Sequence, residues 1–182
     1  MIELLAALSA SAAAGIRIAL PLLIVGILQG NSLWSQVPVL SHVSSPLLFG
    51  LLTSWSLVEI FAAKKLLGQR LLQVIQLLFS PIVGAIMGLA VASATPAPQW
   101  LIGLISGTLA LVLQLVQVGW FYRLRGLPQW AIFIQNFLCV ALVFFAIGAP
   151  WQGGLIALIL LWLAVHSAQR WYQWYREGKV RS

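Results

Sequence analysis

Charge is scarce in this sequence of 182 residues: Asp, Glu, Lys and Arg together make up only 7% of it, whereas hydrophobic residues make up 62%. A soluble domain of this size carries roughly a quarter charged residues, so this chain lacks the polar surface that keeps a protein in water. Continuous apolar runs recur along the whole chain, which indicates a polytopic helical membrane protein. The runs argue against a membrane β-barrel, whose strands alternate apolar and polar residues.

Cysteine is nearly absent as well. Cys139 is the only one, which excludes an intrachain disulfide and a cysteine metal cluster. The two histidines, His42 and His166, are expected near opposite membrane surfaces, so they form no metal-ligand set with Cys139. The sequence also lacks a phosphate-binding loop, a serine elbow and a pair of catalytic acids. We therefore expect no metal, no cofactor and no enzymatic activity.

The formal net charge of +7 does not indicate nucleic-acid binding. The basic residues flank apolar runs, form no stripe and belong to no nucleic-acid-binding motif. The amino-terminal segment has no basic n-region and begins with Glu3. We therefore expect the first apolar segment to be a retained helix and not a cleaved signal peptide.

Six apolar segments predict an all-α fold, a membrane helical bundle with six transmembrane helices in a single domain over residues 1–182. Polar and proline-rich stretches separate them, such as residues 30–46 and "TPAPQ" at 95–99. Three spans followed by three would allow an inverted repeat, which is common in carriers. The expected spans are 4–28, 46–67, 71–94, 100–122, 129–148 and 152–169, followed by a basic aromatic tail at 170–182.

The basic residues predict the orientation of this bundle. Nine of the ten fall on one side of a six-span arrangement, and the tenth, Arg17, lies inside the first span. The positive-inside rule places that side in the cytoplasm. We therefore expect a multi-pass protein of a bacterial-type inner membrane or an internal membrane, with both termini cytoplasmic. The nine residues are Lys64, Lys65, Arg70, Arg123, Arg125, Arg170, Arg176, Lys179 and Arg181.

The tail "RWYQWYREGKVR" at 170–181 interleaves aromatic rings with positive charge. Trp171, Trp174 and Tyr175 share one helical face, as in an interfacial belt with snorkelling arginines. A plain membrane anchor is the favoured interpretation, and contact with anionic lipid or a protein partner is the alternative.

Arg17 and Glu59 are the charged residues expected within the membrane. Glu59 is the only acid away from the chain ends, so it is the only carboxylate available as a counter-ion for Arg17. A lone guanidinium at this depth costs about 3 kcal/mol or more on insertion scales. We therefore expect the two residues to share one polar site, directly or through a water or a glutamine. Structural and functional roles for this pair both stay open.

Proline and glycine predict kinks in the first and third spans. Pro21 has no N–H, so the Arg17 carbonyl loses its helical partner, and Gly15 adds flexibility beside it. Pro81 interrupts the third span in the same way. In lipid, the freed carbonyls need partners from protein or trapped water.

Matched stripes of small and polar residues run along the third and fourth spans. The glycines predict close packing of the two helices in their outer halves. The glutamines, with Gln135 and Asn136 of the fifth span, predict a polar layer nearer the cytoplasm. This layer is either an interhelical hydrogen-bond network or a vestibule. The stripes comprise Gly84, Gly88, Gly103 and Gly107 for packing, and Gln76, Gln114 and Gln117 for the polar layer.

Two stretches, "SAAAGIRIALPLL" at 11–23 and "VEIFAAKKLLGQRLLQVIQLLFSPIVGA" at 58–85, resemble an uncharacterised family of small bacterial integral membrane proteins, domain of unknown function 4126. The shared features are a small-residue run before Gly-x-Arg, a following proline, a glutamate near the end of the second span, and Pro-x-x-Gly-Ala. The resemblance covers about the first half of the chain, and in the second half Gln135 and Asn136 stand where the family tends to have acids. It implies a membrane location and no established activity. The matching residues are Gly15, Arg17, Pro21, Glu59, Pro81, Gly84 and Ala85.

Two functions are compatible with these features. The first is a small transporter or channel, because broken spans and a buried Arg–Glu pair are typical of carriers, with a small molecule or an ion as the substrate. The second is an accessory protein that scaffolds a membrane complex or binds lipid, which the short loops and the basic aromatic tail favour. A water-accessible cavity at Arg17 would favour the first.

Overall fold

The computed structural model describes residues 2–29, 45–62, 66–92, 98–124 and 128–180. In these ranges the secondary structure is helical, with no strand. Four helical segments are long and apolar enough to cross a membrane, namely Leu67–Val91, Gln99–Arg123, Gln129–Gly148 and Pro150–Arg170. The predicted all-α, membrane-type architecture is therefore confirmed. The helices are α1 (Ile2–Ile16), α2 (Ala19–Gln29), α4 (Ser45–Ala62), α5 (Leu66–Val91), α6 (Gln99–Leu124), α7 (Gln129–Gly148) and α8 (Pro150–Val180).

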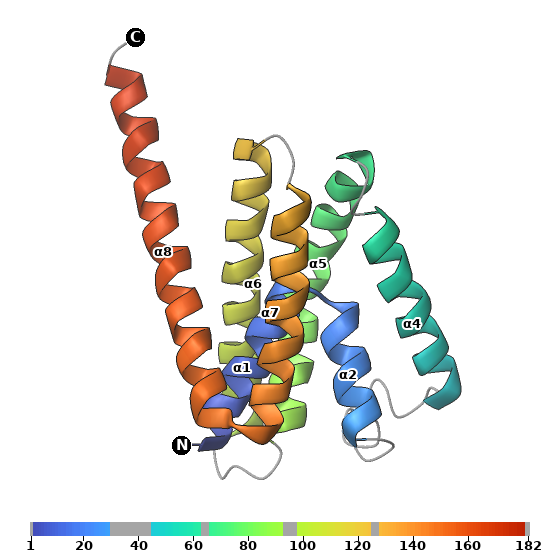
Figure 1. Cartoon of the computed structure of the whole chain (residues 1–182). Helices are drawn as coiled ribbons and strands as arrows, with labels where there is room; N and C mark the ends of the chain where they lie inside the picture. Colours follow the sequence, from blue (N-terminus) through green and yellow to red (C-terminus); the bar gives the residue numbers. More distant parts are fainter. Residues whose placement is uncertain (1, 30–44, 63–65, 93–97, 125–127, 181–182) are drawn as a thin grey trace.

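The segment expected to form the first span, 4–28, consists of two short helices that run in opposite directions. α1 rises from one end of the bundle to its middle, the helix breaks at Arg17 and Ile18, and α2 returns to the same end (Figure 1). α1 has 15 residues and α2 has 11. At ~1.5 Å per residue, both are shorter than a hydrocarbon core of about 30 Å. The two helices therefore form a hairpin, with the geometry of a re-entrant segment, and its tip lies inside the bundle (Figure 1).

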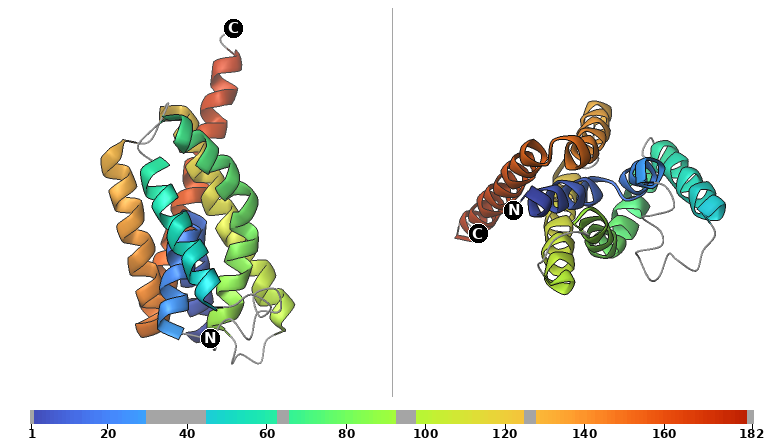
Figure 2. Two further views of the ribbon diagram at one scale, coloured as in Figure 1. Left: turned by 90° about the vertical axis from the view of Figure 1, so that its right-hand side faces the viewer. Right: turned by 90° about the horizontal axis from the view of Figure 1, so that it is seen from below.

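This hairpin changes the relation between the two ends of the chain. The start of α1 and the end of α8 lie at opposite ends of the bundle (Figures 1 and 2). The arrangement thus differs from the predicted single span over 4–28 and from the prediction that both termini share one side. The physical reason is that the break near Gly15 and Pro21 reverses the chain instead of bending it. Hydropathy does not distinguish two half-length apolar helices from one span, because both give a single continuous apolar stretch.

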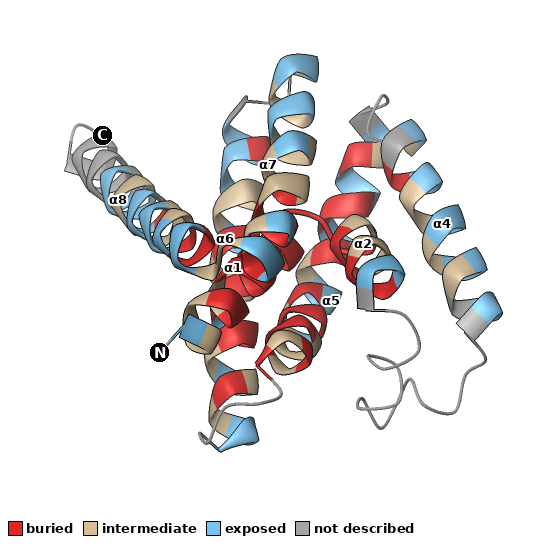
Figure 3. Ribbon diagram, turned by 60° about the horizontal axis from the view of Figure 1, so that its bottom comes forward, coloured by how far each residue is buried: buried red, intermediate tan, exposed pale blue. Residues whose placement is uncertain are grey.

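α1 lies at the centre of the molecule, in contact with α5, α6, α7 and α8 (Figure 3). Every residue from Ser9 to Ile16 is buried, and seven of these eight are Ser, Ala or Gly. Small side chains allow neighbouring backbones to approach closely. A Cβ added to Gly15 would lie 2.9 Å from the Ala110 Cα, so glycine is required where α1 crosses α6.

The α5–α6 hairpin places the predicted glycine stripes at its interface. A Cβ on Gly107 would lie 2.8 Å from the Pro81 carbonyl oxygen, and one on Gly84 would overlap the Ala110 Cβ. Gly88 faces the Ser106 side chain in the same way. Gly103 is looser, because its added Cβ would meet Leu89 Cδ1 at 3.5 Å. Three of the four glycines therefore lie where a side chain does not fit.

α5 and α8 continue through positions where the sequence indicated interruptions. Pro81 lies inside α5, which is one continuous helix from Leu66 to Val91. α8 has 31 residues and extends the last expected span to Val180, so most of the basic tail continues that helix. The side chains at 171 and 173–180 lie outside the described part of the chain, and the anionic-lipid contact of the tail stays a prediction.

Candidate functional site

Arg17 occupies the tip of the re-entrant hairpin, between the last residue of α1 and the first of α2. Its side chain is only 6% exposed. The Nε atom has no hydrogen-bond partner among the described residues. Buried donors are nearly always satisfied, because an unpaired one costs about 1–3 kcal/mol, and more when the group is charged. Arg17 therefore has an unused donor at the centre of the protein.

Glu59, near the end of α4, is even more deeply buried, at 2% exposure. Its carboxylate accepts hydrogen bonds from Trp55 Nε1 and Gln76 Nε2, both at 3.2 Å. It also accepts one from the backbone N–H of Ala19, the first residue of α2. A carboxylate at a helix amino terminus is favourable, because the exposed N–H groups and the helix dipole both attract negative charge. Glu59 thus anchors the returning helix of the hairpin.

Arg17 and Glu59 lie close enough to attract each other electrostatically. Gln76 connects their surroundings, because it donates to Glu59 and also lines the cavity next to Arg17. The charges therefore belong to one polar site. Glu59 balances the charge of Arg17, while its hydrogen bonds go to Trp55, Gln76 and Ala19.

Two backbone carbonyls near the end of α1 accept hydrogen bonds from side chains. The Gly15 carbonyl accepts a hydrogen bond from Gln117 Nε2 at 3.4 Å. The Ala13 carbonyl keeps its helical bond from the Arg17 backbone N–H at 3.0 Å and accepts a second, longer one from Cys139 Sγ at 3.6 Å. In a membrane interior a free carbonyl would cost several kcal/mol, so the Gln117 partner of Gly15 helps to make the break tolerable.

Glutamines from two further helices surround the tip. Gln114 of α6 donates through Nε2 to Gln73 Oε1 at 3.2 Å and to Gln76 Oε1 at 3.5 Å. Gln114 is fully buried, and its Oε1 atom has no partner among the described residues. The amide groups form a partly satisfied network between α5 and α6. Such a network can accept a further donor or reorient around a ligand.

A small cavity adjoins Arg17. Its volume is about 20 Å³, enough for about one water molecule. Its wall is largely polar, because α5, α6 and α7 all contribute glutamines. Arg17 lines this space and its Nε has no partner among the described residues, so a water or a small anion placed there would lie next to the guanidinium. The residues lining the cavity are Arg17, Gln69, Leu72, Gln73, Gln76, Gln117, Ile132 and Gln135.

The structure gathers most of the residues proposed from sequence and leaves one aside. Arg17, Gln76, Gln117 and Gln135 line the cavity, whereas Asn136 does not. Pro21 is buried in the first turn of α2, where a missing N–H is tolerated. The break itself falls at Arg17 and Ile18.

Sequence reasoning missed three contributors to the site. Trp55 lies four residues before Glu59, a spacing that places both on one helical face and could have signalled the contact. Gln69 lies one helical turn before Gln73 on the same stripe of α5. Cys139 had no sequence signal as a partner of Ala13, because that contact joins helices that are far apart in the chain.

Within the described residues, no three His, Cys, Asp or Glu side chains are grouped so that they could hold a metal ion. Neither a curated protein nor a solved structure matches this sequence. The model of one family does match it, the domain of unknown function DUF4126, over residues 4–170. The resemblance seen in the first half therefore extends over nearly the whole chain. The protein belongs to the DUF4126 family.

Proposed function

We propose that this membrane protein moves a small anionic solute across the bilayer, as a transporter or channel, and that Arg17 binds the anion. The observation that carries this proposal is the unpartnered Nε of a buried arginine beside a polar cavity. Charged side chains at such depth are costly and often mark substrate pathways. An anion in the cavity would satisfy the donor that the protein leaves unused.

The broken helix supports the same proposal. Transporters often bind substrates and ions where discontinuous helices end near the middle of the membrane. Here α1 ends and α2 begins at the site. Glu59 occupies the α2 amino terminus, so this terminus is already neutralised. The anion would therefore bind to the guanidinium and the surrounding amides.

The topology that fits this function adds α4 to the four helical segments that are long and apolar enough to cross a membrane, and treats α1 and α2 as a re-entrant hairpin. α4 to α8 alternate in direction along the bundle, and α1 and α2 enter from the end where α5 finishes (Figure 1). Arg70 near the start of α5, Arg123 in the last turn of α6 and Arg170 in α8 belong to the opposite end. The positive-inside rule places that basic end in the cytoplasm. The cavity at Arg17 would then connect most readily to the cytoplasm.

A second candidate is an accessory or lipid-binding protein without transport activity. The observation in its favour is the size of the cavity, about 20 Å³, which is far below the roughly 300 Å³ of ordinary ligand sites. In this conformation the centre of the bundle is closed. Transport would require a movement of the hairpin tip relative to α5, α6 and α7.

An uptake experiment in liposomes separates the two candidates. The purified protein is reconstituted, and uptake of radiolabelled chloride, formate, acetate and phosphate is compared with protein-free liposomes. We expect uptake of at least one anion and a loss of tenfold or more in Arg17→Gln, because the amide removes the charge that binds the anion. Arg70→Gln removes an exposed charge outside the site and should transport like the unmodified protein. Folded protein that moves none of the anions would contradict transport and favour the accessory role. Normal transport by Arg17→Gln would contradict the binding of the anion by Arg17.

A further inference from the structure

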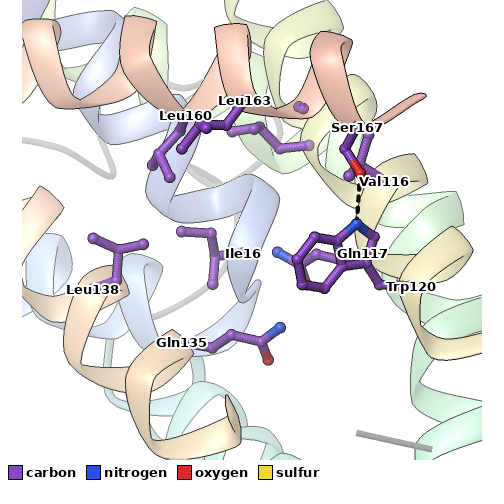
Figure 4. Close-up of a pocket in the computed structure, with 11 residues that line it drawn as sticks. Ile16, Val116, Gln117, Trp120, Gln135, Leu138, Leu160, Leu163 and Ser167 are labelled. Atoms are coloured by element: carbon purple, nitrogen blue, oxygen red, sulfur yellow. Dashed lines mark hydrogen bonds between the residues drawn. The ribbon is translucent and has the colours of Figure 1, made fainter. Parts of the chain in front are cut away.

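A larger and mainly apolar pocket lies next to the small polar cavity. It has a volume of about 240 Å³ and is bounded by the end of α1 and by α6, α7 and α8 (Figure 4). Ile16, Leu138, Leu160 and Leu163 supply apolar walls. The volume lies just below the roughly 300 Å³ at which drug-sized ligand sites begin. The pocket therefore suits one slender apolar chain and not a bulky ligand.

Two amide side chains separate this pocket from Arg17. Gln117 and Gln135 are the residues that line both spaces. They extend from α6 and α7 toward each other across the pocket (Figure 4). Arg17 lines the small cavity that both amides also line, and its Nε has no partner among the described residues. Two amide side chains thus lie between the apolar pocket and the small cavity that contains the buried positive charge.

The wall of the pocket is incomplete on the α8 side. α7 and α8 meet at one end of the bundle and diverge toward the basic end (Figures 1 and 2). Leu163 is 49% exposed although it lines the pocket, so the wall on the α8 side is incomplete. The Trp120 indole donates to Ser167 Oγ at 2.8 Å, which bridges α6 and α8 at the margin of the pocket (Figure 4). A ligand could therefore enter sideways from the bilayer.

We propose that this pocket binds a single-chain amphiphile with a carboxylate head, as in a medium-chain fatty acid. The alkyl chain lies among the leucines, and the carboxylate displaces the amides of Gln117 and Gln135 to reach Arg17. A neutral amphiphile would leave the guanidinium donor unpaired, so charge complementarity selects the acid. The inference rests on the proposed anion-binding role of Arg17 and names the class of its substrate.

Tryptophan quenching in lipid nanodiscs tests this binding site. Bromine quenches indole fluorescence at short range, and Trp120 lines the pocket. The signal of Trp120 is the difference between the unmodified protein and Trp120→Phe. We expect saturable quenching of that signal by 10-bromodecanoate, and at least tenfold weaker binding of 10-bromodecanol, which has the same chain without the charge. Arg17→Gln should weaken binding of the acid by tenfold or more and leave the alcohol unchanged.

A pair of variants on α8 tests whether the amphiphile binds in this pocket. Ala164 is 4% exposed and lines the pocket, whereas Leu158 is 43% exposed and does not. Ala164→Phe should abolish saturable quenching by filling the pocket, and Leu158→Phe should leave it intact. If Ala164→Phe does not fold, Leu163→Trp fills the same space from an exposed position, with its own Trp120→Phe background for the difference.

The outcomes distinguish this inference from the proposed function. Equal quenching by acid and alcohol, or quenching that survives both the filled pocket and Arg17→Gln, would overturn the amphiphile site. Uptake of chloride or formate in liposomes could still occur in that case, and the proposed function would stand. Binding of bromodecanoate that depends on Arg17, without uptake of any anion, would support this site and contradict transport.

Discussion

Arg17 and Glu59 are both buried but differ in how their polar atoms are used. Glu59 accepts hydrogen bonds from Trp55, Gln76 and the Ala19 backbone, whereas Arg17 Nε has no partner among the described residues. Removing either charge would leave the other uncompensated in a medium of low dielectric constant. This asymmetry means that Glu59 stabilises the fold of the hairpin, while Arg17 retains the capacity to bind a ligand.

A double-mutant cycle tests whether the two charges act together. Arg17→Leu and Glu59→Leu should each destabilise the protein by about 3–5 kcal/mol, because each leaves one buried charge unpaired. The double variant should lose clearly less than the sum of the two single losses. Thermal unfolding in detergent measures the stability of the three variants relative to the unmodified protein. Arg70→Leu, at an exposed position, serves as the control. Additive losses would mean that the residues act independently.

At the scale of helices, small residues decide how closely the elements approach. α1 packs against four neighbours because its second half, from Ser9 to Gly15, consists of Ala, Ser and Gly. α5 and α6 are in contact at Gly84 and Gly107, whose added Cβ atoms would meet Ala110 and the Pro81 carbonyl. Close packing of this kind holds helices together in lipid, where burial of apolar surface supplies no driving force between them.

Alanine substitutions on these helices separate packing from helix propensity. Gly84→Ala and Gly107→Ala should destabilise the protein by about 1–3 kcal/mol, because each forces the backbones apart. Gly119→Ala is the matched control on α6, since nothing lies within 4 Å of its added Cβ. It should be neutral or stabilising by up to about 1 kcal/mol. The midpoint of thermal unfolding should therefore fall in Gly84→Ala and Gly107→Ala, and it should stay the same or rise in Gly119→Ala. Equal midpoints in all three variants would refute tight packing at this interface.

For the whole molecule, the hairpin of α1 and α2 decides which helix ends lie at the same end of the bundle (Figure 1). The start of α1 and the end of α2 lie at one end of the bundle, and the end of α8 lies at the other (Figure 1). A six-span protein would instead place the start of α1 with the end of α8. The two arrangements therefore predict different labelling patterns.

Single cysteines introduced into a Cys139→Ala background distinguish the two topologies. Ile2, Leu28 and Tyr172 are exposed by 61%, 49% and 62%, and each is replaced in turn. A membrane-impermeant maleimide applied to intact cells should label Ile2→Cys and Leu28→Cys but not Tyr172→Cys. All three should react after the membrane is permeabilised. Protection of Ile2→Cys together with labelling of Leu28→Cys would restore the six-span arrangement.

The fold class and several site residues could be predicted from the sequence, because each depends on a local property. Apolar runs indicated membrane helices, and scarcity of acids left Glu59 as the counter-ion candidate for Arg17. Gly15 and Pro21 marked the place where the first helix is interrupted. Trp55 and Gln69 were missed although their spacing on α4 and α5 carried a signal, whereas the Cys139 contact with Ala13 carried none.

The sequence by itself determined that this is a membrane protein with a helical architecture, that it belongs to the DUF4126 family, and which residues cannot face lipid. Composition decides the membrane location, the helical architecture and the residues that avoid lipid, because burial of a charge or of a free backbone group in hydrocarbon is costly wherever it occurs. Only the tertiary structure decided that the chain reverses at Arg17 and that Glu59 meets the amino terminus of α2. The same apolar residues fit a straight span and a re-entrant hairpin equally well. The choice between them depends on partners such as Gln117, 102 residues away from Gly15, for a carbonyl at the end of the broken helix.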